Sequence, residues 1–306
     1  MRASWHGGGT VDLTSFAGRR PLWRRLPPGV VPAFVAIWMM AAPAHPAERV
    51  DLELVLATDT SRSIDESEAR LQREGVAAAL RHPDIIGAIQ SGYHKKIAAA
   101  YIDYSSRNFN EIIVEWRIID GLQSAAAFAR ALTETPLTFG RRTSISDGLE
   151  MAAQMIESNQ YIGTRRVIDV AGDGPNNHGR LVNDVRDEII AKGITINGLP
   201  IINDGNFGFA RQFNIEDLDD YYRGCVIGGN AAFLVVARDF KDFARAIRRK
   251  LIFEIAQSGT GTEAKMQNLL HRIVQTGRPH GAYVYKRGCD IGERLWLRRF
   301  YDPDNY

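Results

Sequence analysis

The feature that most restricts the fold of this sequence is the alternation of apolar, strand-like runs with helical patterns between residues 48 and 256. Strands are expected at residues 50–57, 97–104, 111–118, 166–171, 194–202 and 232–237. Helices are expected at residues 65–80, 124–132, 146–157, 181–191 and 239–256. Strands that alternate with helices form a mainly parallel sheet with helices on both faces. The pattern therefore predicts a doubly wound α/β domain with six strands over residues 48–256.

One pair of strands breaks the parallel arrangement. The runs at 97–104 and 111–118 are separated only by a short polar turn around residues 105–108. A parallel pair needs a crossover of a dozen or more residues, so these two strands are expected to pair antiparallel. The sheet should then carry one antiparallel edge strand.

The two ends of the chain differ in composition from this region. Residues 19–25 are basic, residues 30–42 are apolar apart from one proline, and Ala42-Pro43-Ala44 is a run of small residues. That order is typical of a secretory signal peptide, and the apolar part is shorter than the roughly 20 residues needed to span a bilayer. Residues 1–47 are therefore predicted to be a signal peptide or N-terminal export segment, with an uncleaved anchor as the alternative, and no later segment is apolar enough to span a membrane. The predicted location is periplasmic or secreted.

The last segment, residues 257–306, begins with a linker-like run and continues with mixed basic and aromatic residues. It is interpreted as a C-terminal extension, either a small appendage or a poorly ordered tail. The chain has 38 Lys and Arg against 36 Asp and Glu, a net charge of +2, which does not favour nucleic acid as a partner. Cys225 and Cys289 are too few for a disulfide scaffold. Two separate thiols are the favoured interpretation, and a single disulfide is the alternative for an exported protein.

Polar side chains follow two of the predicted strands. Asp59, Ser61 and Ser63 come directly after the first strand, and Asp173 follows the fourth. Ligands of open α/β sheets bind beyond the carboxyl ends of the strands. If the first and fourth strands are neighbours, the two carboxylates meet at one crevice, and Thr143, in the loop before the third long helix, can reach over it. These five residues form the candidate site.

All five candidate donors are oxygen atoms. Carboxylate and hydroxyl oxygens are hard ligands that suit Mg²⁺, Mn²⁺ or Ca²⁺ better than zinc or copper. Two carboxylates only balance the charge of a divalent ion, and hydroxyls add none. A bound ion would keep one coordination position open, which an acidic side chain of a partner could fill. The donors therefore predict a metal-bridged binding site.

These motifs resemble the von Willebrand factor type A domain and its metal-ion-dependent adhesion site (MIDAS), over residues 50–256. The Asp-x-Ser-x-Ser motif is matched by Asp59, Ser61 and Ser63, the second-loop threonine by Thr143, and the later aspartate by Asp173. Residues 169–179 and 244–251 look closest to a bacterial branch, domain-of-unknown-function family 1194. The resemblance implies that Ser61, Ser63 and Thr143 contact Mg²⁺ directly, and that the two aspartates do so directly or through water.

The sequence departs from that family at two places. Arg141 and Arg142 precede Thr143, where the family more often has small residues; they could repel the metal or favour an anionic partner. Gly172 stands where a threonine is usual. His178, in the polar loop that follows Asp173, is taken as a further candidate for partner contact, with a plain surface role as the alternative.

The predicted function is that of an exported, divalent-metal-dependent module that binds a protein or another carboxylate-bearing ligand and has no catalytic activity. One alternative is a metal-dependent phosphoester hydrolase, and another is a structural domain with a degenerate metal site. Catalysis is disfavoured because Ser61 stands where an aspartyl phosphotransferase needs a second acid, and no general base is evident beside Ser61 or Ser63. Walker and Gly-x-Ser-x-Gly motifs are also absent from the sequence.

Overall fold

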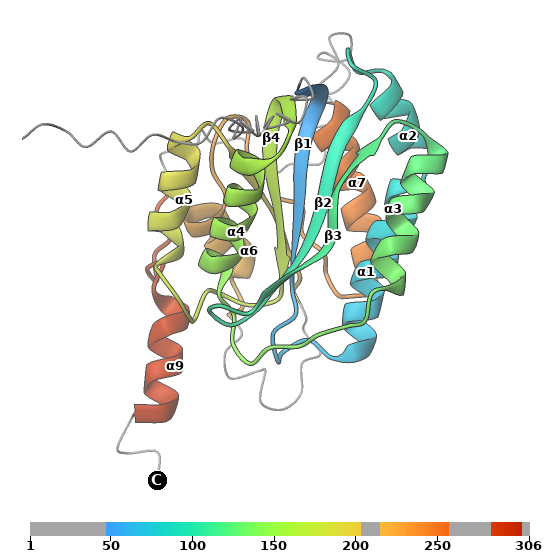
Figure 1. The fold of residues 1–306 in the computed structure, drawn as a ribbon. Coiled ribbons are helices and arrows are strands. Elements are labelled where there is room, and N and C mark those ends of the chain that lie inside the picture. The colour runs from blue at the N-terminus through green and yellow to red at the C-terminus, as the bar shows by residue number, and fades with distance from the viewer. Residues whose placement is uncertain (1–46, 203–214, 257–282, 302–306) are drawn as a thin grey trace, which may run out of the picture. The chain divides into compact units, whose positions relative to one another are not determined.

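The domain is built around a five-stranded sheet (Figure 1). The structure is a computed structural model, and it describes residues 47–202, 215–256 and 283–301. The strands are β1 (Glu48–Asp59), β2 (Ile97–Tyr104), β3 (Asn110–Ile119), β4 (Tyr161–Gly172) and β5 (Thr195–Pro200), in the order β3-β2-β1-β4-β5. β1 pairs parallel with both β2 and β4, and β4 pairs parallel with β5. β3 pairs antiparallel with β2 at the edge. The predicted mainly parallel sheet with one antiparallel edge strand is confirmed.

The prediction of a sixth strand at 232–237 is wrong. These residues lie beside β5 but make only isolated bridges, Gly198 to Leu234 and Ile201 to Ala237. The N–H of Ala237 donates to the Pro200 carbonyl at 3.0 Å, but a proline has no N–H to return to the segment, so the ladder is interrupted there. A buried apolar run therefore follows the sheet edge without becoming a regular strand.

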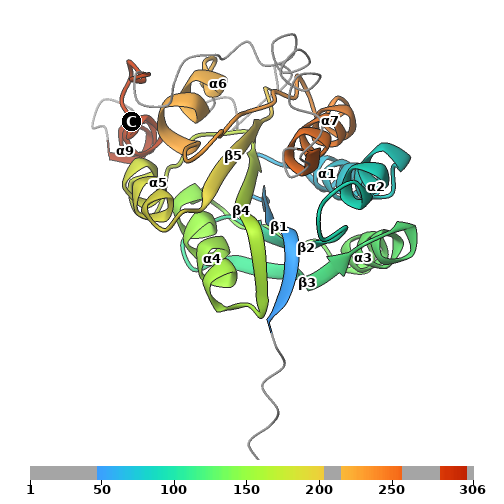
Figure 2. The same cartoon turned by 90° about the horizontal axis from the view of Figure 1, so that it is seen from above.

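Helices cover both faces of the sheet, as predicted (Figure 2). One face carries α1 (Glu66–Leu80), α2 (Pro83–Gln90), α3 (Leu122–Glu134) and α7 (Phe243–Ala256), which share one buried apolar cluster with the sheet. The other face carries α4 (Ile145–Ser158), α5 (Val182–Ala191), α6 (Leu218–Tyr221) and the single π-helical turn η2 (Tyr222–Val226). The short helix α2 was not expected from the sequence.

The start of α1 is determined by a local signal. The carboxylate of Asp65 accepts a hydrogen bond from the N–H of Glu68 at 2.9 Å, and the Glu68 carboxylate accepts one from the N–H of Asp65 at 2.9 Å. This reciprocal capping box satisfies two backbone donors that the first turn leaves open. It begins the helix a few residues after β1, so residues 60–64 form a tight connection at the carboxyl edge of the sheet.

The two cysteines pair, so the interpretation as separate thiols is wrong. Cys225, at the end of η2, forms a disulfide with Cys289, and their Cα atoms are 5.5 Å apart. The bridge joins the domain to the C-terminal extension just before its helix α9 (Ile291–Tyr301). Residues 257–282 of the extension lie outside the described residues.

Apart from Ala47, the predicted export segment also lies outside the described residues. Among the helices of the described ranges, none combines the length and apolar character needed to cross a bilayer.

Candidate metal centre

Four of the five predicted site residues form one connected group at the carboxyl edge of the sheet. Asp59 is the last residue of β1, and Asp173 directly follows β4, its parallel neighbour. The hydroxyl of Ser63 donates to Oδ1 of Asp173 at 2.7 Å, and the Ser61 and Ser63 hydroxyl oxygens are 3.0 Å apart. The adjacency of β1 and β4, on which the prediction depended, brings both carboxylates to this edge.

The Asp59 carboxylate lies in an unfavourable environment. Its side chain is fully buried, Oδ1 accepts a hydrogen bond from the N–H of Ser61 at 2.7 Å, and Oδ2 is buried with no hydrogen-bond partner within the described ranges. Burial raises the pKa of Asp59 well above its ordinary value, and the nearby Asp173 carboxylate raises it further. A buried acceptor without a donor is costly. A divalent cation would satisfy that oxygen and offset the repulsion, so the donor set fits a hard metal ion.

Thr143 is brought to the same edge by its loop. The N–H of Gly140 donates to the Thr60 carbonyl at 3.0 Å, which ties the loop to the end of β1. The N–H of Thr143 donates to Oδ1 of Asn177 at 3.0 Å, and the N–H of Asn177 donates to the Thr143 carbonyl at 2.9 Å. Thr143 is therefore held between the segments that carry Asp59 and Asp173.

The two arginines before Thr143 have different surroundings. Arg141 is exposed, and its backbone N–H donates to the Ser106 hydroxyl at 3.2 Å. Arg142 is half-buried: its guanidinium lies 4.0 Å from the centre of the Trp296 ring and donates to the Asn177 carbonyl. Arg141 is thus exposed next to Thr143, whereas Arg142 is engaged in holding two segments of the protein together.

His178 also has a local structural contact. Its Nδ1 accepts a hydrogen bond from the N–H of Arg107 at 3.0 Å, which requires that nitrogen to be unprotonated. Partial burial lowers the pKa of His178, and the charge of Arg142 lowers it further. The neutral imidazole thus connects the loop after β2 to the loop after β4.

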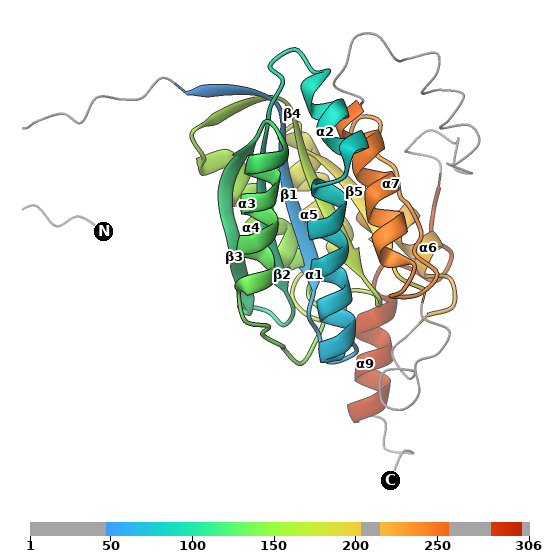
Figure 3. The same ribbon diagram turned by 90° about the vertical axis from the view of Figure 1, so that its right-hand side faces the viewer.

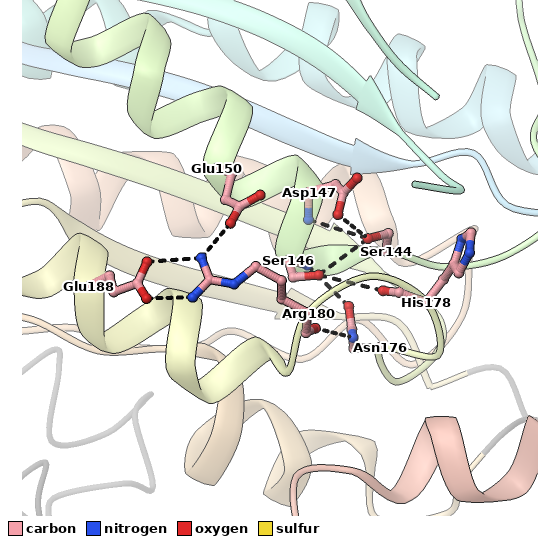
Figure 4. Close-up of polar contacts among 8 residues, drawn as sticks. All are labelled: Ser144, Ser146, Asp147, Glu150, Asn176, His178, Arg180 and Glu188. Carbon is pink, nitrogen blue, oxygen red and sulfur yellow. Dashed lines mark hydrogen bonds and ion pairs between the residues drawn. The ribbon is translucent and has the colours of Figure 1, made fainter. Parts of the chain in front are cut away.

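The loop after β4 is fixed to the start of α4 by polar side chains that the sequence reading did not single out (Figure 4). Oδ1 of Asn176 accepts from the N–H of Ser146 at 3.1 Å, and Nδ2 of Asn176 donates to the Arg180 carbonyl at 3.0 Å. The Arg180 side chain forms ion pairs with Glu150, at 2.7 Å, and with Glu188. The Asn-Asn pair after Asp173 was the available signal, because asparagine side chains commonly organise loops.

Two buried tyrosines explain the glycine before Asp173. The Tyr104 hydroxyl, from β2, donates to the Ala171 carbonyl at 3.0 Å. A Cβ atom added to Gly172 would lie 2.7 Å from that hydroxyl oxygen, 3.0 Å from the Tyr222 hydroxyl oxygen and 3.1 Å from Cβ of Asp59. The threonine usual at this position would not fit. Tyr104 and Tyr222 occupy its space, and burial raises the pKa of both.

Gly172→Ala is expected to lower the free energy of unfolding by about 1–3 kcal/mol, the usual cost of overpacking a core. The matched control is Gly174→Ala, because a Cβ at Gly174 would meet no atom within 4 Å. Urea denaturation of both variants is the measurement. Adding Tyr104→Phe to Gly172→Ala removes the nearest oxygen and should recover part of the loss. Equal stability of the two alanine variants would contradict this account of the glycine.

Among the described residues, the carboxylates at this edge are too few to hold a metal ion by themselves. In residues 47–202, 215–256 and 283–301, no three His, Cys, Asp or Glu side chains gather into a group that could hold a metal ion. A cation at this edge would therefore depend on hydroxyl ligands as well as on the carboxylates of Asp59 and Asp173.

Solved structures similar to this chain include the pilus adhesin SpaC from Lactobacillus rhamnosus GG, with a TM-score of 0.49, 13% identity, and coverage of 67% of this chain and 30% of that chain. A second is proximal thread matrix protein 1 from the mussel byssus, described with a zinc-occupied MIDAS motif, with a TM-score of 0.45, 14% identity, and coverage of 66% and 45%. A third is a von Willebrand factor type A protein from Catenulispora acidiphila, with a TM-score of 0.44, 14% identity, and coverage of 67% and 43%. The chain thus spans less than half of each, and at these TM-scores the similarities carry no argument about binding.

The arrangement of the chain agrees with the family that its motifs resemble. The strand order, the antiparallel edge strand and the helices on both faces form the α/β architecture that the resemblance to the von Willebrand factor type A domain implied. Among curated proteins, none matches this sequence. The family described as "Protein of unknown function (DUF1194)" matches residues 49–259, well over half of the chain. The expected relation is confirmed, and the chain belongs to the DUF1194 family.

Proposed function

We propose that this protein is a divalent-metal-dependent binding module without catalytic activity of its own. The residues that would hold Mg²⁺, or Mn²⁺ or Ca²⁺ in its place, are Asp59, Ser61, Ser63, Thr143 and Asp173. The proposal depends mainly on one observation: a fully buried Asp59 carboxylate, with one oxygen lacking a hydrogen-bond donor within the described ranges, lies at the sheet edge where Ser61 and Ser63 connect it to Asp173.

The charge balance supports a partner that carries a carboxylate. Asp59 and Asp173 together neutralise a dication, and the hydroxyl ligands add no charge. When bound, the cation would supply an open coordination position for an anionic oxygen. The two carboxylates that would hold the cation are themselves oriented by the protein, because Oδ1 of Asp59 accepts from the Ser61 N–H at 2.7 Å and Oδ1 of Asp173 accepts from the Ser63 hydroxyl at 2.7 Å.

The rim of the site supports the same class of partner. Arg141 is exposed beside Thr143, and Arg107 is exposed on the loop after β2, so both guanidiniums can attract an acidic protein surface. Phe109 and Phe139, 39% and 40% exposed, lie on the same two loops and can add apolar contact. Because Arg142 and His178 connect segments of the protein itself, we assign partner contact mainly to Arg141.

Export to the periplasm or the cell exterior is part of the proposal. It is supported by the basic, apolar and small-residue order of the first 47 residues. The Cys225–Cys289 disulfide adds support, since such bonds persist mainly in oxidising compartments.

Titration with Mg²⁺ and Mn²⁺ by calorimetry tests the proposed function. Wild-type protein should release or absorb heat with a one-to-one stoichiometry, and Ser61→Ala with Ser63→Ala should weaken binding by about 100-fold or more, since it removes two ligands. Ser158→Ala, an exposed serine at the opposite end of α4, is the matched control and should bind as the wild type does.

The same preparations separate the alternatives. Turnover of a generic phosphoester that disappears in Asp59→Ala would replace the binding module with a hydrolase. Absence of both heat and a shift in melting temperature for the wild type would identify a degenerate site.

A further inference from the structure

The C-terminal helix α9 lies at the end of the molecule where β1 finishes, the same end as the candidate metal centre (Figures 1 and 3). The segment that leads into it is anchored by the disulfide between Cys289 and Cys225 of η2. The Tyr221 hydroxyl strengthens this anchor, because it accepts from the N–H of Asn176 at 3.1 Å and donates to the Cys289 carbonyl at 3.5 Å. The extension is thus joined to the loop that follows Asp173.

One side chain of α9 contacts the loop that carries Thr143. The Trp296 ring lies 4.0 Å from the Arg142 guanidinium, close enough for a cation–π interaction. That guanidinium donates to the Asn177 carbonyl, and Asn177 exchanges two hydrogen bonds with Thr143, of 2.9 and 3.0 Å. Trp296 therefore supports the backbone of Thr143 through two intermediate residues.

A second side chain of α9 contacts the loop that carries Asp173. Oε1 of Glu293 accepts from Nδ2 of Asn176 at 2.7 Å, and Asn176 in turn accepts from the N–H of Ser146 at the start of α4. The approach is close: a Cβ atom on Gly292 would lie only 2.0 Å from the Asn176 carbonyl oxygen. The helix thus packs directly on the backbone of this loop.

We propose that α9 is a disulfide-anchored clasp that positions the Thr143 and Asp173 loops for metal binding, with Trp296 and Glu293 as its positioning residues. The proposal rests on the proposed function, since it assigns the extension a role at the same site. Metal ligands carried on loops need supporting contacts, because small displacements of a ligand weaken a site. The clasp supplies these contacts for the two ligands that come from the loops before α4 and after β4, while Asp59 is the last residue of β1, and Ser61 and Ser63 lie in the tight connection from β1 to α1.

Trp296→Ala in the full chain tests this role with two readouts. Amide hydrogen exchange at Thr143 and Asn177 should become about tenfold faster or more, while the amides of β1 stay protected. Affinity for Mn²⁺ should fall by about 10- to 100-fold, the usual effect of removing a residue that supports a metal ligand. Trp296→Phe keeps a ring over Arg142 and should restore most of both properties. Leu297→Ala, a change at a neighbouring and 53% exposed residue of α9, is the matched control and should change neither.

A second variant, Glu293→Ala, removes the acceptor of the Asn176 side chain. It should speed hydrogen exchange at the Ser146 amide, because that N–H donates to Oδ1 of Asn176. Unchanged exchange at Thr143, Asn177 and Ser146 in the two variants would overturn the clasp, whatever the metal result. Faster exchange with wild-type Mn²⁺ affinity would overturn its role at the metal centre. If the wild type binds no Mn²⁺ and the variants still exchange faster, α9 supports the loops but the proposed function is refuted.

Discussion

Lys250→Met should lower the free energy of unfolding by about 3–5 kcal/mol, the usual cost of removing one partner from a buried ion pair. Lys250, on α7, is fully buried; it forms an ion pair with Asp169 of β4, and its Nζ lies 3.7 Å from a carboxylate oxygen of Glu254. Asp169 and Glu254 are buried as well. The variant leaves two carboxylates in the core without this cation. Urea denaturation at neutral pH measures the loss.

The loss should depend on pH. Burial raises the pKa of Asp169 to about 7, and the charge of Lys250 holds it below the value that burial alone would cause. An aspartate whose pKa is raised in the folded state costs stability as pH rises from its unfolded value towards its folded one. Without Lys250 the folded pKa rises further, so the difference between variant and wild type should grow from pH 6 to pH 8.

Two further variants check this interpretation. Arg249→Met removes the neighbouring exposed cation on α7 and should change stability by no more than about 0.5 kcal/mol. Adding Asp169→Asn to Lys250→Met removes the buried carboxylate that has lost its cation and should recover part of the loss, whereas Glu254 keeps its ion pair with Arg165. A deficit for Lys250→Met as small as that of Arg249→Met would show that the core carboxylates do not need their lysine.

The contacts of Lys250 could not be predicted from the hydrophobic pattern of the sequence. The apolar spacing of residues 239–256 correctly predicts a helix that packs on the sheet, because periodicity reports which face is buried. It does not report that a lysine and a glutamate lie on that face. Lys250 and Glu254 can be buried because they have partners. Lys250 pairs with Asp169, while Glu254 accepts a hydrogen bond from Asn197 at 2.6 Å and pairs with Arg165 at 3.0 Å. All three come from strands distant in sequence.

The difference between local patterns and contacts distant in sequence also explains which parts of the sheet and of the candidate site could be predicted. The parallel strands, the antiparallel hairpin and the positions of Asp59 and Asp173 at strand ends follow from local patterns and chain direction. The sixth strand fails because Pro200 lacks the N–H that the ladder needs. The Cys225–Cys289 pairing depends on the path of the chain between the two residues. The role of Arg142 depends on Trp296 in the C-terminal extension, where the sequence shows no clear hydrophobic period from which a helix could be predicted.

Asp59→Asn should make the metal-free protein more stable and at the same time abolish its response to Mn²⁺. Burial, and then the charge of Asp173, raise the pKa of Asp59, so its ionised form costs stability as pH rises above the ordinary value of 3.8. At pH 8 the neutral amide should raise the free energy of unfolding by about 1–3 kcal/mol, because a buried carboxylate beside Asp173 costs more than a buried neutral amide at the same place. Thermal unfolding with chelator and with Mn²⁺, from pH 5 to pH 8, measures both effects.

The two effects separate a metal ligand from a structural carboxylate, because a residue kept for stability alone should not improve stability when its charge is removed. In the wild type, Mn²⁺ should raise the melting temperature more at pH 8 than at pH 5, since binding requires an ionised Asp59. The variant should keep a weaker decline with pH, because Asp103 and Asp169 have their pKa raised to about 6 and about 7 by burial and remain in place. Asp65→Asn is the matched control: hydrogen bonds, first from Ser67, lower the pKa of that exposed cap, and its change should leave the Mn²⁺ response intact. If Asp59→Asn were instead less stable than the wild type in chelator at pH 8, the Asp59 carboxylate would be serving the fold, and the reason for placing a cation beside it would be lost.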